Sequence, residues 1–109
     1  MPNLKTTIYF DKVFTDAIND ALNSILGESV AKALFYHLNV KLEEIPENPS
    51  RFAVELENIF GEGASLIERS IIKNLCLKLG LEYQAINEFD FADHIEHIKK
   101  QILKLERSG

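Results

Sequence analysis

Apolar residues along most of the chain recur at intervals of three and four positions, the spacing that places them on one face of an α-helix. The pattern covers residues 12–26, 28–39, 49–60, 64–79 and 89–107, and it predicts five helices. Because each helix has one apolar face to bury, we expect an all-α fold. The sequence therefore predicts a single helical domain over residues 1–109, built as a compact bundle of about five helices.

Residues at the ends of these segments are typical of helix termini. Asp11 precedes the first segment in the position of an N-cap, and Gly27 separates the first segment from the second. Asn48 followed by Pro49 is a capping residue followed by proline at the first helical position. Gly80 follows the fourth segment as a C-terminal stop. Each of these residues fixes a predicted boundary.

Two stretches lack the helical pattern. The residues Thr6–Phe10 are β-branched and aromatic, and they predict a short extended segment before the first helix. A lone strand needs a partner, which a second copy of the chain could supply. In the connector of residues 41–50, Leu42 and Ile45 are expected to anchor one short turn in the core.

The last two predicted helices carry more apolar surface than a small domain easily hides. Residues 64–79 are apolar over a wide arc, with Leu66 and Leu77 on the side opposite the main stripe. The last helix has a seam spaced 4, 3, 4, 3 at Phe91, Ile95, Ile98, Ile102 and Leu105. This surplus of apolar surface predicts self-association, and a symmetric homodimer is the commonest form.

The helix over 49–60 is expected to bury Phe52, Ala53, Leu56, Ile59 and Phe60.

Composition and charge narrow the function. The chain is 46% hydrophobic and carries a net charge of −5, from 17 acidic and 12 basic residues. The negative charge disfavours nucleic-acid backbones and anionic membranes as partners. The first ten residues lack the apolar core of a signal peptide, and no apolar run is long enough for a membrane span. Because the single cysteine, Cys76, also fits a reducing compartment, we expect a cytoplasmic protein with no membrane segment.

The histidines are the first candidates for chemistry. Asp90, His94 and His97 share one face of the last helix and could begin a metal site. Such a site needs three or four ligands, and the only other histidine is His37. We therefore expect His94 and His97 to lie at the solvated rim of the apolar stripe, with no metal bound.

The other candidate groups also predict structure rather than catalysis. Cys76 lies within an apolar stretch without a nearby histidine, so we expect a buried, unreactive thiol. The Gly61-Glu62-Gly63 turn has a glutamate where a phosphate loop needs positive charge. The acidic residues around the connector prolines should be solvated: Glu43, Glu44 and Glu47. We expect no enzyme activity and no cofactor.

The helix pair over 49–79 has the outline of a helix-turn-helix. Polar residues on the second helix could read bases or contact phosphates: Arg69, Ser70, Lys73 and Asn74. Leu66 and Leu77 lie among them, and the first helix carries Glu55 and Glu57, where DNA binding favours lysine. The leading hypothesis is therefore a protein–protein interaction face made by Leu66, Arg69, Ser70, Lys73, Asn74 and Leu77. The alternative is a nucleic-acid-binding protein that uses the helix over 64–79.

Residues 46–75 carry a set of local motifs. These are Pro46-Glu47-Asn48-Pro49, then Phe52, then Ile59-Phe60-Gly61-Glu62-Gly63-Ala64, then an apolar helix with Glu68. The pattern resembles the small helical output domains of archaeal signalling proteins, in particular the group named Nitrosopumilus output domain 5. The likeness extends back to Gly27-Glu28-Ser29 and forward to Phe89-Asp90-Phe91, whereas the segment before the first helix has no place in it. The resemblance implies an archaeal cytoplasmic origin and an interaction or output role, without catalytic residues.

Overall fold

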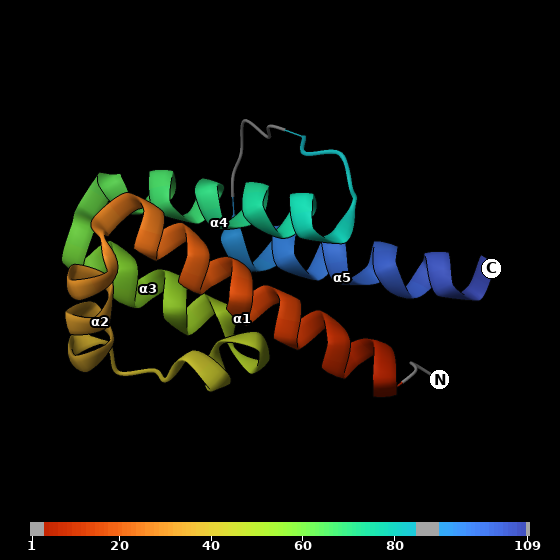
Figure 1. The fold of residues 1–109 in the computed structure, drawn as a ribbon, viewed down its shortest axis with the longest axis horizontal. Helices are drawn as coiled ribbons and strands as arrows, with labels where there is room; N and C mark the ends of the chain where they lie inside the picture. Colours follow the sequence, from red (N-terminus) through yellow and green to blue (C-terminus); the bar gives the residue numbers. More distant parts are fainter. Residues whose placement is uncertain (1–3, 85–89, 109) are drawn as a thin grey trace.

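The chain folds as an all-α bundle in a computed structural model that describes residues 4–84 and 90–108 (Figure 1). The elements are α1 Leu4–Leu26, α2 Glu28–His37, α3 Pro49–Phe60, α4 Ala64–Leu79 and α5 Phe91–Ser108, with 3-10 turns η1 Leu42–Glu47 and η2 Gly61–Gly63. No strand occurs among these described residues. The predicted fold class is therefore confirmed. The expected start of the last helix at Phe89 lies outside the described residues, which resume at Asp90.

The extended N-terminal segment predicted for Thr6–Phe10 is wrong. Helix α1 begins at Leu4, so Asp11 lies within the helix instead of capping it. The reason is burial, because Phe10 is only 2% exposed and continues the apolar stripe of α1 one turn before Phe14, whose ring centroid lies 6.0 Å away. Burial of this large ring outweighs the modest β-preference of the surrounding residues.

The core is centred on α1 and α4. These two helices pack along each other, while α3 contacts both α4 and α5 (Figure 1). Three phenylalanines link the elements: the ring of Phe91 lies 6.1 Å from that of Phe14 on α1 and 5.9 Å from that of Phe52 on α3. Helix α5 is therefore fixed at its first turn, where Phe91 enters the core.

The predicted caps at Asn48 and Gly80 are confirmed. The Asn48 side chain accepts a hydrogen bond from the Arg51 backbone N–H at 3.3 Å, and Pro49 occupies the first position of α3. Gly80 has a φ of 71°, in the left-handed region. Leu81 N–H donates to Cys76 O at 2.8 Å, and Gly80 N–H donates to Leu77 O at 3.3 Å, the pattern of a Schellman motif. The end of α4 is thus set by glycine.

Three side chains show where the structure agrees with the predicted helical pattern and where it does not. Ile45 in η1 is fully buried, as expected for the short turn. Helix α2 ends at His37, two residues early, because Leu38 leaves the helix to enter the core. The predicted burial of Ile59 is wrong, since 45% of this residue is exposed near the end of α3. The neighbouring Phe60 is instead the residue of this turn that packs against the core.

Candidate functional site

The outer face of α4 carries the six residues predicted to form an interaction surface. Leu66 and Leu77 are 73% and 80% exposed, although they are large apolar residues. The polar members lie between them on the same side of the helix, with Lys73 exposed and three half-buried: Arg69, Ser70 and Asn74. Lys73 Nζ lies 5.3 Å from the centroid of the Tyr83 ring. The structure therefore brings the six together as one surface, called here the outer face.

The inner face of α4 contains a charged residue that the sequence prediction missed. Glu68 is only 4% exposed and lies within the buried stripe of Ala64, Ile67, Ile71, Ile72 and Leu75. Its position is readable from the sequence, because residue 68 precedes Ile71, Ile72 and Leu75 by three, four and seven positions. A carboxylate at such a position either has a partner or costs stability.

Glu68 lines a small cavity of about 260 Å³ between α3, α4 and the start of α5. Helix α3 contributes residues at the spacing of one helical face: Ser50, Ala53, Val54 and Glu57. The start of α5 contributes Asp90, Phe91 and Ala92. Three carboxyl groups, those of Glu57, Glu68 and Asp90, therefore line one cavity, which is called here the acidic pocket.

The surroundings of Glu68 favour its neutral form. Burial raises the pKa of Glu68 to about 7, and the nearby carboxylates of Glu57 and Asp90 act in the same direction. The guanidinium of Arg69 opposes them more weakly. Within the described part of the chain, Glu68 Oε2 is buried and has no hydrogen-bond partner. The acidic pocket therefore holds a carboxyl group that titrates near neutral pH.

The two histidines of α5 have different environments. The prediction that His94 lies at a solvated rim is wrong, because His94 is 7% exposed and follows Phe91 by one turn on the buried side. Burial lowers the pKa of His94, and His97 and Arg69 act in the same direction. His97 is exposed, as expected. Among the described residues, no group of three or more His, Cys, Asp or Glu has the arrangement of a metal site.

Asp90 has a structural role at the start of α5. Its Oδ1 accepts a hydrogen bond from the Asp93 backbone N–H at 2.9 Å, and its backbone carbonyl accepts from His94 N–H at 3.0 Å. These bonds are those of an N-cap. Asp90 therefore holds the first turn of α5 and still lines the acidic pocket.

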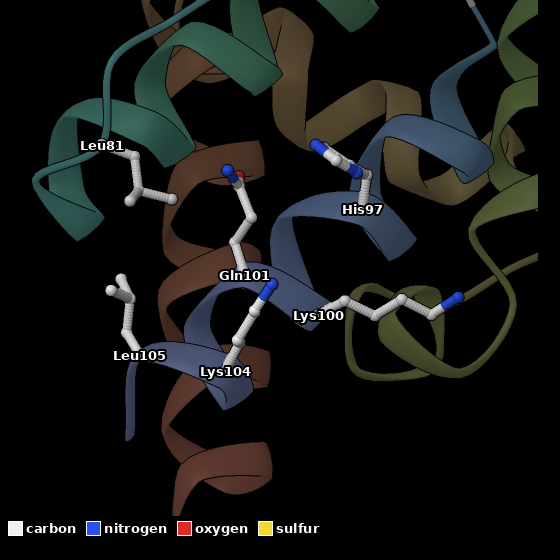
Figure 2. A pocket seen from close by; sticks show the side chains of 6 residues that line it. All are labelled: Leu81, His97, Lys100, Gln101, Lys104 and Leu105. Atoms are coloured by element: carbon white, nitrogen blue, oxygen red, sulfur yellow. The ribbon is translucent and has the colours of Figure 1, made fainter. Parts of the chain in front are cut away.

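A second hollow, of about 620 Å³, lies beside the C-terminal half of α5 (Figure 2). Its lining is mainly basic and amide side chains with two leucines: Leu81, His97, Lys100, Gln101, Lys104 and Leu105. In Figure 2 the Lys100 side chain extends away from the two leucines. The basic groups therefore do not converge on one point, and the hollow has the character of an open surface.

The remaining candidate nucleophile is Cys76, on the inner side of α4. The thiol is buried, as predicted, and burial raises its pKa. A raised pKa keeps the sulfur protonated, whereas a reactive thiol needs a lowered one.

The chain matches no family model and no curated protein, and its fold matches no solved structure. Across the described residues, no helix has the length and apolar character needed to cross a membrane.

Proposed function

We propose that this chain is a non-enzymatic helical module that binds a second copy of itself through the outer face of α4. The observation that carries the proposal is the exposure of Leu66 and Leu77 at 73% and 80%. They lie eleven residues apart on one stripe, with polar and basic groups between them. Protein interfaces combine apolar anchors with a polar surround in this way.

The charge around the outer face favours a protein partner over a nucleic acid. The basic residues of this face are Arg69 and Lys73, and the neighbouring Lys78 is engaged by Asp20, with 2.6 Å between Nζ and Oδ2. With a net charge of −5, the chain as a whole repels a phosphate backbone. The α3–η2–α4 pair therefore supports the helix-turn-helix alternative only in outline.

A non-enzymatic role is supported by the state of the ionisable groups that could react. The Cys76 thiol is buried with a raised pKa, and Glu68 lines a cavity with no cysteine or histidine among its described lining. The further proposal of a cytoplasmic output role in archaeal signalling rests on the sequence motifs of residues 46–75 alone.

Sedimentation-velocity measurements over a concentration series test the proposal. We expect a monomer–dimer equilibrium for the unmodified chain and a monomer for the double variant Leu66→Gln/Leu77→Gln. Glutamine keeps the helix propensity of leucine and adds no charge. The matched control is Tyr36→Gln on α2, a residue that is 83% exposed, and this variant should dimerise normally.

The possible results separate the alternatives. A monomer at all concentrations contradicts self-association. Equal weakening of the dimer by Tyr36→Gln contradicts the placement of the interface on the outer face of α4. A mobility shift of duplex DNA at low salt that is lost in Arg69→Gln/Lys73→Gln would instead support the nucleic-acid alternative.

A further inference from the structure

We propose that the acidic pocket is a binding site for an organic cation, an alkylammonium or alkylguanidinium group. The inference is independent of the proposed dimer, because the pocket lies on the inner side of α4 and the proposed interface on its outer face.

The first support is the convergence of acceptors from three elements. Glu57 from α3, Glu68 from α4 and Asp90 at the start of α5 line one cavity, and Ser50 adds a hydroxyl. No lysine or arginine is among its described lining residues. Glu57 and Asp90 both disfavour the ionised form of Glu68, and a cation between the carboxyl groups would remove that repulsion.

The second support is the state of Glu68, which does not depend on the other two carboxylates. Only 4% of the surface of Glu68 is exposed, and its Oε2 has no hydrogen-bond partner among the described residues. A buried oxygen without a partner costs free energy, which a donor would recover. Ammonium and guanidinium groups are donors without acceptors, so they match a lining of carboxylate oxygens.

The size and lining of the cavity indicate an organic ion. A volume of about 260 Å³ is much larger than a single water or bare metal ion requires. The carboxylates lack the arrangement of a metal site within the described chain. The apolar part of the lining suits the methylene stem of an amine or of a lysine or arginine side chain: Ala53, Val54, Phe91 and Ala92.

The test uses the full chain and four probes followed by NMR shifts of backbone amides. The free cations are n-butylammonium and methylguanidinium, the tethered cation is the blocked peptide acetyl-Gly-Arg-Gly-amide, and n-butanol is the neutral control. We expect the cations to shift amides of residues 50–57, 68 and 90–92, and n-butanol to leave them in place. Shifts spread evenly over the acidic surface would overturn the proposal.

A matched pair of variants tests the role of the carboxyl group. At pH 8, above the pKa of about 7 of Glu68, Glu68→Gln should weaken binding about tenfold or more, because it replaces a charged acceptor by a neutral one. Glu62→Gln changes the net charge equally, but on exposed η2 outside the pocket, and it should bind as the unmodified chain does. Equal losses in the two variants would show a nonspecific charge effect and overturn the proposal.

A measurement on the unmodified chain avoids any effect of substitution on folding. Glu57, Asp90 and Arg69 are the charged groups that act on Glu68 from the surrounding elements. Because a bound cation favours the ionised carboxyl group, saturation with n-butylammonium should lower the pKa of Glu68 by about one pH unit. Affinity should accordingly rise between pH 6 and pH 8. An unchanged pKa would overturn the proposal.

The probes also distinguish two sources of the same cation. Tighter binding of the arginine peptide than of methylguanidinium indicates the side chain of a partner protein. Equal or tighter binding of the free cations indicates a small amine. Absence of binding by all three cations would overturn the proposal, while leaving the outer-face dimer to its own test.

Discussion

The two faces of α4 each contain residues of the kind expected on the other. The inner face buries Glu68 among isoleucines and leucines, and the outer face exposes Leu66 and Leu77 among polar groups. A helix that only supported the bundle would need neither feature, because a carboxylate inside and leucines outside both lower stability or solubility. Glu68 on the inner face and the two leucines on the outer face therefore mark two separate candidates for binding.

The largest expected effect on stability comes from truncating an apolar side chain on the inner face of α4. Leu75 is fully buried, so Leu75→Ala should lower the free energy of unfolding by about 2–5 kcal/mol. Urea denaturation followed by circular dichroism measures this change. A loss below about 1 kcal/mol would mean that the inner face of α4 does not form the centre of the core.

The next effect is a pH dependence caused by Glu68. The pKa of Glu68 is about 7 in the folded chain and near the ordinary value of 4.5 in the unfolded chain. The folded state therefore holds the proton more tightly, so its stabilising contribution is complete below pH 4.5 and is lost as the pH rises through 7. The free energy of unfolding should therefore fall by about 3 kcal/mol over this pH range. Denaturation between pH 4.5 and 8 should show this decline in the unmodified chain and a flatter profile in Glu68→Gln.

His94 provides an internal contrast of opposite sign. Burial lowers its pKa, so its stabilising contribution is present above the ordinary value of 6.5 and is lost as the pH falls through the folded-state value. Both chains contain His94, so its contribution cancels when the free energy of unfolding of Glu68→Gln is subtracted from that of the unmodified chain at each pH. A difference that does not change with pH would contradict the assignment to Glu68.

The two ends of α4 allow a smaller, matched test with glycine. Gly80 has a φ of 71° and nothing within 4 Å of an added Cβ, so Gly80→Ala should cost about 1–2 kcal/mol through backbone conformation alone. Gly63 has a φ of −65°, where alanine is favoured and its Cβ would meet Phe60 Cβ at an ordinary 3.9 Å. Gly63→Ala should therefore be neutral or slightly stabilising. Thermal melts of both variants check the pair, and equal losses would contradict the explanation.

Residues whose role depends on local spacing were predictable, and those that depend on tertiary neighbours were not. The Asn48-Pro49 start and the Gly80 stop follow from backbone rules that act within a few residues. The start of α1 did not follow from such rules, because it depends on the burial of Phe10 in the core, where Lys99 Nζ of α5 lies 6.0 Å from the centroid of its ring. Glu68 had a readable position on the helix, but the carboxylates of Glu57 and Asp90 join it only in three dimensions.

The smallest expected effect on stability concerns the exposed leucines of the outer face. At concentrations where the chain is monomeric, Leu66→Gln/Leu77→Gln should change the free energy of unfolding by less than about 0.5 kcal/mol per site, because exposed side chains contribute little to folding. At high concentration the unmodified chain should gain stability through dimerisation and the double variant should not. Urea denaturation at two concentrations checks both statements. A loss above about 1 kcal/mol per site in the monomer would show that the leucines support the fold of one copy, and the outer face would then have no surplus apolar surface for a partner.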